Sequence, residues 1–262
     1  MFSNSIIIAA HPDDEVLWFS SILSKVDEIV LCFLAVPSKP VWTEGRQKSL
    51  NAYPLNNVHC LELVESEVFE GVDWDRPVTT EFGLRITENR LSDKAYKENF
   101  HLLKTRLRDH IRGCDNVFTH NSWGEYGHVE HVQVYRAVKA LQEEMQFNLW
   151  FSNYASNKSA FLMASQLPEL TTQVTMQTNK PLAERIAEIY KRNDCWTWYD
   201  DYVWSDSEVF IKETVAPSDE ARYGALLQIN LIKIGIQPDQ PSSLERLSLK
   251  LRGKLKKLLL AT

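Results

Sequence analysis

A run of branched apolar residues, Ile6 to Ile8, leads almost directly into the polar stretch His11-Pro12-Asp13-Asp14-Glu15. Branched apolar residues suit a strand that is buried on both faces of a sheet, and Pro12 cannot continue the hydrogen-bond ladder. The pattern therefore predicts a buried strand that ends in a turn carrying an imidazole and three carboxylates. Carboxylates this close are tolerated when a positive charge offsets their repulsion, which favours a bound cation. His11 with either aspartate would supply the mixed nitrogen and oxygen ligands that suit zinc or another borderline metal.

A second polar loop follows another short apolar run, residues 116–119, much later in the chain. It bears glycines and leads into a helical pattern that begins with His128 and His131. Residues three apart lie on one face of a helix, so one imidazole can bind a metal while the other approaches whatever the metal holds. The two loops together predict a composite metal site at one end of a sheet.

Strand and helix patterns alternate through the first 155 residues. Apolar spacing predicts helices over 16–25, 43–53, 94–112 and 129–144, and strands over 28–36, 58–63, 116–119 and 147–153, with 65–91 as a long surface excursion. This order predicts parallel strands joined by right-handed crossovers, with functional loops at the carboxyl ends of the strands. The expected fold class is α/β: a Rossmann-like, open, mostly parallel sheet with helices on both faces and a C-terminal helical and aromatic extension.

Beyond residue 155 the pattern loosens to a short strand over 174–177, a helix over 180–191 and an aromatic stretch over 195–204. The aromatic stretch would either pack as part of an irregular cap or form a stacking wall for a sugar ring, with Asp200 or Asp201 binding hydroxyl groups. We expect a Rossmann-like metal-binding core over 1–155, the remainder of the same catalytic domain over 156–240, and a separate C-terminal helix over 241–262.

The C-terminal stretch 244–262 contains six Lys or Arg and one Glu, in a chain whose net charge is -6. Leucines over 244–260 fall on one helical face. A basic amphipathic helix favours peripheral contact with an anionic membrane, which would bring a cytosolic enzyme to a lipid-linked substrate. The alternative is a terminal helix that packs on the core or on a second subunit of a homo-oligomer.

Composition excludes several other classes of protein. A chain of net charge -6 lacks the broad basic surface that nucleic-acid binding needs, so a sugar or another neutral substrate fits better. The four cysteines form no CxxC pair, which favours reduced thiols in a cytoplasmic protein. No apolar run approaches the ~20 residues of a membrane-spanning helix.

The two loops together resemble the LmbE-like, or PIG-L, family of zinc-dependent N-deacetylases, which includes N-acetylglucosaminyl-phosphatidylinositol de-N-acetylase. The residues that carry the resemblance are His11-Pro12-Asp13-Asp14-Glu15 and Tyr126-Gly127-His128-Val129-Glu130-His131. Two such signatures in this order, each after an expected strand, are specific, whereas either alone would be weak. The resemblance implies that His11, Asp14 and His131 bind Zn²⁺, with Fe²⁺ as the alternative, and that a coordination position stays open for water.

The same resemblance implies a mechanism. Asp13 would be the general base that takes a proton from the zinc-bound water as it attacks an N-acetyl group. His128, expected as an imidazolium, would stabilise the oxyanion and act in acid catalysis, and the Tyr126 hydroxyl would point at the same oxygen.

Residues expected near the substrate are less specific. The resemblance places Arg46 where it would bind a substrate hydroxyl or phosphate, and it suggests that Glu15 orients ligands or loop amides. Trp198 and Asp200 are the substrate-contact candidates of the aromatic stretch. The chain also departs from the common family pattern, because it has Ser49 where many relatives have Glu, and Val129-Glu130 in place of Pro-Asp.

The expected function is therefore hydrolytic removal of an N-acetyl group from a sugar in a glycolipid, a polysaccharide precursor or a small glycoside. One alternative is an amidase for a larger acyl or peptide-like group, which would share the machinery. The other is a non-catalytic metal-binding or sugar-binding module. Catalysis requires Asp13 and an open coordination position, whereas binding requires neither.

Overall fold

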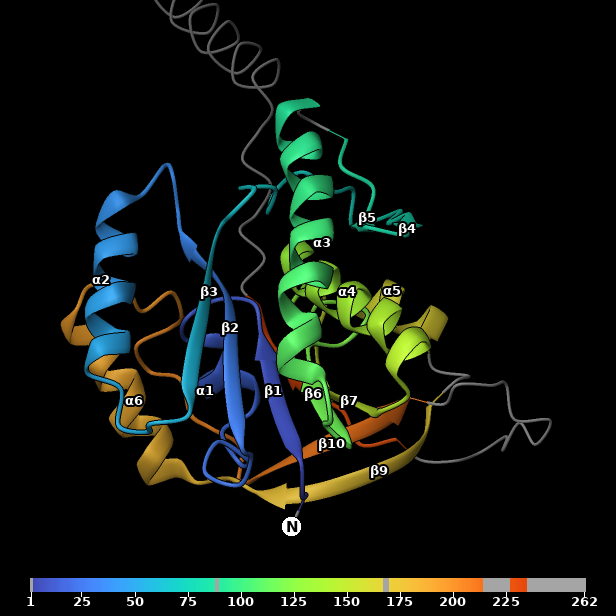
Figure 1. Ribbon diagram of the computed structural model, residues 1–262. Helices are drawn as coiled ribbons and strands as arrows, with labels where there is room; N and C mark the ends of the chain where they lie inside the picture. The colour runs from blue at the N-terminus through green and yellow to red at the C-terminus, as the bar shows by residue number, and fades with distance from the viewer. Residues whose placement is uncertain (1, 88–89, 167–169, 214–226, 235–262) are drawn as a thin grey trace, which may run out of the picture. The chain divides into compact units, whose positions relative to one another are not determined.

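A seven-stranded sheet in the order β3-β2-β1-β6-β7-β10-β9 forms the centre of the described part of the chain (Figure 1). The computed structural model describes residues 2–87, 90–166, 170–213 and 227–234, and the chain up to Ile232 forms one compact unit. The strands are β1 Ser5–Ala9, β2 Glu28–Ala35, β3 Val58–Val64, β6 Asn116–Thr119, β7 Asn148–Ser152, β9 Leu170–Gln177 and β10 Ser207–Glu213.

Strands β3, β2, β1, β6 and β7 pair in parallel, while β10 pairs antiparallel with both β7 and β9. The predicted Rossmann-like, mostly parallel α/β sheet is thus confirmed. The described helices are α1 Asp14–Trp18, α2 Pro40–Asn51, α3 Arg90–Ile111, α4 Val129–Met145, α5 Ala160–Gln166 and α6 Lys180–Arg192. Short strands β4 Thr79–Thr80 and β5 Gly83–Leu84 pair with each other, as do β8 Tyr154–Ser156 and β11 Asn230–Ile232.

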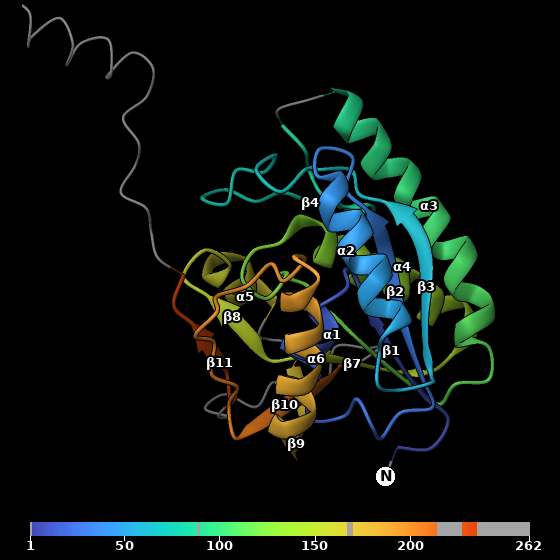
Figure 2. The ribbon, with the colours of Figure 1, turned by 90° about the vertical axis from the view of Figure 1, so that its left-hand side faces the viewer.

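Strand β1 is buried on both faces, as its branched apolar residues predict. Ile6 and Ile8 belong to one apolar cluster with side chains of α3 and α4, whereas Ile7 belongs to another with side chains of α1 and α6. Successive side chains of a strand point to opposite faces, so β1 ties the two layers together. Figures 1 and 2 show α3 and α4 on one side of the sheet and α1 and α6 on the other.

The first helix is shorter than its apolar spacing predicts, since α1 ends at Trp18 rather than near residue 25. A distant carboxylate provides the physical reason. Glu208 of β10 accepts hydrogen bonds from the backbone N–H groups of Ser20 and Ser21, at 3.2 and 2.8 Å. These amides bind the carboxylate instead of continuing the helical ladder, so the chain leaves the helix after one turn.

Three further features differ from the sequence prediction. Strand β10 was not predicted, and the strand expected over 174–177 begins at Leu170. The segment 65–91 is more than a surface excursion, because Val68, Val72 and Leu84 are buried in the cluster under α3 and α4.

The predicted basic helix over 244–260 lies outside the described residues. None of the helices among the described residues combines the length and the apolar composition of a membrane-spanning segment. All four cysteines are free.

Candidate metal and catalytic site

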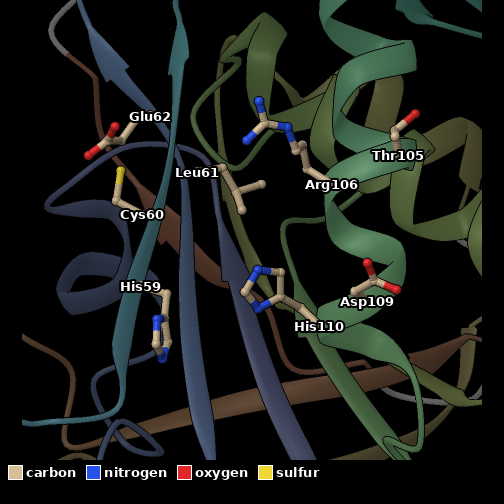
Figure 3. A pocket seen from close by; sticks show the side chains of 8 residues that line it. All are labelled: His59, Cys60, Leu61, Glu62, Thr105, Arg106, Asp109 and His110. Carbon is tan, nitrogen blue, oxygen red and sulfur yellow. The ribbon is translucent and has the colours of Figure 1, made fainter.

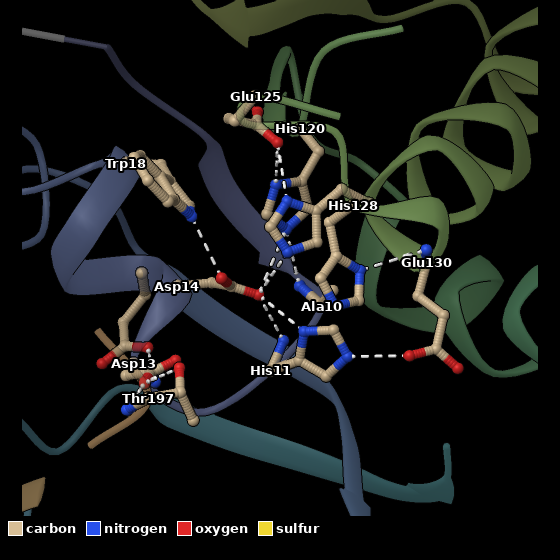
Figure 4. Close-up of polar contacts among 12 residues, drawn as sticks. Ala10, His11, Asp13, Asp14, Trp18, His120, Glu125, His128, Glu130 and Thr197 are labelled. Carbon is tan, nitrogen blue, oxygen red and sulfur yellow. Dashed lines mark hydrogen bonds and ion pairs between the residues drawn. The ribbon is translucent and has the colours of Figure 1, made fainter. Parts of the chain in front are cut away.

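The two polar loops meet because β1 and β6 are neighbours in the sheet, with Ile7 of β1 beside Phe118 of β6. The turn after β1 carries His11 and Asp14, and the loop after β6 leads to His131 in the first turn of α4. Asp14 Oδ2 lies 3.0 Å from His11 Nδ1 and 3.1 Å from His131 Nε2. Figure 4 shows the side chains of His11 and Asp14 next to each other.

The donor set suits a divalent cation. His131 Nε2 is buried without a hydrogen bond of good geometry, even though Asp14 is close. Burial opposes protonation of His11 and His131, but Glu65 and Asp14 outweigh it at His11, and Asp14 and Glu125 do so at His131. The pKa of His11 rises to about 10 and that of His131 to about 9. Both imidazoles thus lie in a strongly negative environment, which also favours a bound cation.

Side chains able to bind a metal form three overlapping groups in the described part of the chain. They are His11 with His128 and His131, Asp14 with His120 and His131, and His11 with Glu65 and Glu130.

A fully buried carboxylate, Glu125, holds His131 in place. Its Oε2 accepts hydrogen bonds from His131 Nδ1 at 2.7 Å and His120 Nδ1 at 3.0 Å. Its Oε1 accepts from the Asn121 backbone N–H at 3.0 Å and from Ser152 Oγ at 2.7 Å. Burial would raise the pKa of Glu125, but His120 and His131 lower it to about 2 through their charges and hydrogen bonds. The second nitrogen of His120 is also used, since Nε2 accepts from the Ala10 N–H at 2.8 Å.

Sequence reasoning missed Glu125 as a functional residue. The available signal was an acid within the second motif loop, together with the rule that ligating histidines usually donate their other N–H to a carboxylate.

Glu130 contacts His11 in the way that Glu125 contacts His131. Its Oε2 lies 3.0 Å from His11 Nε2, and its Oε1 accepts from both the backbone N–H and the hydroxyl of Ser66 at 2.7 Å. Glu130, one of the departures from the pattern of the family that the motifs resemble, thus contacts His11 of the other loop.

Asp13 sits at the tightest point of the first turn, in the left-handed region with φ 102°. Its backbone N–H donates to Glu15 Oε2 at 2.9 Å. Its Oδ2 accepts from the backbone N–H and the hydroxyl of Thr197, at 2.9 and 2.6 Å. Burial and the neighbouring Asp14 charge raise the pKa of Asp13 to about 7, despite these hydrogen bonds.

His128 caps the first turn of α4 through its ring. Nδ1 accepts from the backbone N–H of Glu130 at 3.2 Å, which requires a lone pair on Nδ1. Burial and the positive charges of His131 and His11 lower the pKa of His128 well below its usual value. The structure therefore favours a neutral ring with its proton on Nε2, in contrast to the imidazolium that the sequence analysis expects. The ring stacks on His131 at 4.5 Å between centroids, and Tyr126 lies 5.7 Å from it.

A cleft of about 410 Å³ opens over these groups, and its wall includes His11, Asp13, Asp14, Tyr126 and His128. Of the predicted substrate contacts, Arg46 and Trp198 line it. Only 2% of Arg46 is exposed, and its guanidinium donates to Glu65 Oε1 at 2.5 Å and to the Leu34 carbonyl at 3.2 Å.

Glu15 and Asp200, also expected near the substrate, do not line this cleft. Glu15 is fully buried, and its Oε1 accepts from the hydroxyls of Tyr53 and Tyr190, both at 2.9 Å. Its Oε2 accepts from the Asp13 N–H, so Glu15 stabilises the turn. Asp200 points to solvent, with 92% of its side chain exposed.

A second pocket, of about 520 Å³, lies between β3 and α3 (Figure 3). It is larger than the cleft, but its polar groups do not converge. His110 Nδ1 is paired with Glu28 at 2.7 Å, and His59 lies 3.7 Å from the same oxygen. His59 is near the start of β3, whereas functional loops of parallel sheets gather at the carboxyl ends of the strands. The convergence of metal-binding side chains, rather than the volume of the pocket, therefore identifies the candidate site.

Solved structures with the same fold include deacetylases. One is a deacetylase–teicoplanin complex from the biosynthesis pathway of teicoplanin, with 14% identity, a TM-score of 0.51, and coverage of 79% of this chain and 97% of that one. Another is the deacetylase–bog complex from that pathway, with 14% identity, a TM-score of 0.52, and coverage of 82% and 99%. The zinc-inhibited form of teicoplanin deacetylase Orf2 has 13% identity, a TM-score of 0.51, and coverage of 82% and 99%.

The family model described as PIG-L, GlcNAc-PI de-N-acetylase, matches residues 6–142. This match covers more than half of the 262 residues and includes both polar loops. The chain belongs to the PIG-L family.

Proposed function

We propose that this protein is a metal-dependent N-deacetylase that acts on an N-acetylated sugar. Family membership supports the reaction class, and the likeness in fold to deacetylases agrees with it. The observation that carries the proposal is the convergence of His11, His131 and Asp14 Oδ2 on one point beside Asp13.

His11, Asp14 and His131 are the proposed ligands because His11 Nδ1 and His131 Nε2 both lie beside Asp14 Oδ2. Both nitrogens of His120 already take part in hydrogen bonds. Glu65 is paired with Arg46. Zn²⁺ is the proposed ion and Fe²⁺ the alternative, since two imidazoles and a carboxylate suit borderline metals.

A divalent ion held there would acidify the attacking water and polarise the amide carbonyl. Asp13 takes one proton from that water, and the water oxygen forms the new bond to the carbonyl carbon. Because Thr197 occupies Oδ2, Oδ1 is the proposed acceptor. The protonated Asp13 then gives this proton to the nitrogen as the C–N bond breaks, so that the products are a primary amine and acetic acid, which loses its proton to give acetate.

His128 and Tyr126 are proposed to stabilise the oxyanion of the tetrahedral intermediate. With Nδ1 engaged at the start of α4, His128 offers its Nε2–H as a neutral donor. One donor of this kind contributes about 3 to 4 kcal/mol to lowering the barrier.

The cleft also supports a sugar substrate. Trp42, Phe69 and Trp198 line it, and the faces of aromatic rings offer apolar surface for the C–H face of a sugar. The same walls would accommodate a larger acyl group, so that alternative is kept as part of the substrate test.

The test is a panel of N-acetylated sugars, free, nucleotide-linked and lipid-linked, together with analogues carrying longer acyl groups. The zinc-loaded protein is incubated with each compound, and released acid and primary amine are measured beside metal content. We expect acetate from at least one sugar. A fully loaded protein that releases no acid from any compound would instead favour the non-catalytic binding module.

Two variants test the residue assignments. Asp13→Asn should keep the metal and lose turnover by about 10²- to 10⁴-fold, the usual contribution of a general base. His131→Ala should lose the metal itself. Asp200→Asn, the same chemical change on an exposed side chain, is the control and should do neither. Unchanged turnover in Asp13→Asn would remove it from the mechanism, and full metal occupancy in His131→Ala would disprove the ligand assignment.

A further inference from the structure

The proposed base, Asp13, is held by a residue that follows it 184 positions later in the sequence. Thr197 donates twice to Asp13 Oδ2, through its backbone N–H at 2.9 Å and its hydroxyl at 2.6 Å. Thr197 also lines the cleft beside Asp13. It lies outside residues 6–142, which the family model matches, so neither motif loop accounts for it.

The segment that carries Thr197 is anchored on both sides. Before it, Cys195 is fully buried, and its backbone N–H donates to the Tyr190 carbonyl of α6 at 3.1 Å. After it, the Trp204 indole donates to the Val16 carbonyl of α1 at 2.8 Å. Trp198 adds ring contacts with Tyr126 at 4.8 Å. The position of Thr197 is therefore fixed against the same turn that it contacts.

Two contacts on one oxygen define the direction of a carboxylate. The backbone of Asp13 is already constrained by its N–H bond to Glu15, which leaves rotation of the side chain as the main remaining freedom. The paired donors of Thr197 fix Oδ2, so the other oxygen has a set orientation. In the proposed mechanism, that oxygen receives the proton of water and later returns it to the leaving nitrogen.

We propose that Thr197 is a positioning residue that aims the Asp13 carboxylate, an inference that rests on the proposed function. It touches no reacting atom and acts through Asp13 alone. The bonds formed and broken are unchanged: one proton moves from water to Asp13 Oδ1, and then from Oδ1 to the amine. Thr197 keeps the acceptor oxygen in place through both transfers. Misplacing a reacting group by about 1 Å costs on the order of 10²-fold in rate.

The test compares Thr197→Val, which keeps the shape and removes the hydroxyl, with Thr197→Ser, which keeps the hydroxyl. Thr178→Val is the matched control, because the Thr178 hydroxyl is buried and has no hydrogen-bond partner within the described part of the chain. For each purified full-length protein, kcat, KM, metal content and melting temperature are measured with the best substrate of the panel.

Thr197→Val should lower kcat about 10- to 100-fold, as expected for one lost hydrogen bond to a charged group. Its KM should stay within about 2-fold, because the substrate does not bind the hydroxyl. Metal content should equal that of the wild type. Thr197→Ser should recover kcat to within about 3-fold, and Thr178→Val should match the wild type. If Thr197→Val is insoluble, Thr197→Ala removes the same hydroxyl and carries the same expectation.

A wild-type kcat in Thr197→Val would overturn the inference. So would a failure of Thr197→Ser to recover kcat, an equal loss in Thr178→Val, or a loss that follows metal content. These outcomes are distinct from failure of the proposed function, in which the wild type itself would release no acid from any substrate.

Discussion

Replacing Glu125 by Gln tests whether the histidine ligands depend on a buried carboxylate. The substitution keeps the shape of the side chain but replaces one oxygen by an NH₂ group. Four donors surround the carboxylate: His131 and His120 at Oε2, and the Asn121 N–H and Ser152 hydroxyl at Oε1. An amide nitrogen cannot accept from any of them.

The least costly orientation places the new NH₂ group at the Oε1 position. The Ser152 hydroxyl can rotate and become an acceptor there, whereas the Asn121 N–H cannot. One buried N–H then loses its partner, which costs about 1 to 3 kcal/mol. The bonds from His131 and His120 end on a neutral oxygen, and loss of charge assistance costs roughly 1 kcal/mol for each. Stability should therefore fall by about 3 to 5 kcal/mol, a large part of the ~5 to 15 kcal/mol that a folded domain has.

Metal affinity should fall as well, because a neutral partner orients His131 less firmly and makes its Nε2 a weaker donor to the metal. Loss of such a partner typically costs about 10- to 100-fold in affinity. Since the Gln carbonyl still accepts from His131, we expect about 10-fold. Denaturant unfolding of the metal-free protein gives the stability, and zinc competition with a chromophoric chelator gives the affinity.

Glu208→Gln is the matched control for this experiment. Glu208 is also fully buried and accepts four hydrogen bonds, from the Ser20 N–H and hydroxyl, the Ser21 N–H and the Tyr154 hydroxyl. It contacts neither His11 nor His131 in the described residues. Glu208→Gln should therefore change stability without changing zinc affinity. Wild-type zinc affinity in Glu125→Gln, or an equal loss in the control, would refute the reasoning.

Three other outcomes are expected. Burial raises the pKa of Glu208 above 4.5, so its stabilising contribution is present below the unfolded pKa and is lost as pH rises through the folded one. The stability lost in Glu208→Gln should thus be greater at about pH 5 than at about pH 8, and equal losses in denaturant titrations would contradict this. Glu130→Asp shortens the side chain by one methylene and should weaken its contact with His11. Zinc affinity, measured by competition with a chelator, should fall about 10-fold. Unchanged affinity would show that Glu130 does not hold the His11 imidazole. A Cβ at Gly124 (φ 69°) would come within 2.4 Å of the His128 carbonyl, whereas one at Gly113 (φ 85°) would meet nothing within 4 Å. Gly124→Ala should therefore destabilise by at least about 1 kcal/mol more than Gly113→Ala in thermal unfolding.

The sequence predicts the parallel part of the sheet well because most of its strands are short apolar runs bounded by polar residues. It does not predict β10, whose residues 207–213 include Glu208 and Glu213, both buried in the structure. Two carboxylates in a seven-residue stretch read as a surface segment. Their burial depends on partners that are distant in sequence: Ser20 and Ser21 for Glu208, and Tyr135 and Lys139 for Glu213.

The residues of the site likewise fall into those that the sequence predicts and those that it does not. The motif residues are recognisable because metal chemistry restricts them to a few side-chain types at short spacings. Glu125 could have been inferred, since it stands inside a motif and its role follows from the needs of an imidazole ligand. Thr197 could not, because a threonine in an aromatic stretch carries no local signal. Its contact with Asp13 spans 184 positions of the sequence.

We therefore expect residues 1–155 to need the remainder of the catalytic domain, residues 156–240, to hold the first turn. Two side chains beyond that boundary contact the first turn, since Tyr190 donates to Glu15 and Thr197 donates to Asp13, while Glu208 accepts from the amides after α1. These contacts are buried or partly buried, and their loss would leave polar groups of the turn without partners, at about 1 to 3 kcal/mol each. In addition, β7 would lose its antiparallel partner β10 and become an open edge of the sheet. A fragment that ends near residue 155 would thus keep the histidines and aspartates of the proposed metal site in its sequence, but without the contacts that hold the first turn in its catalytic shape.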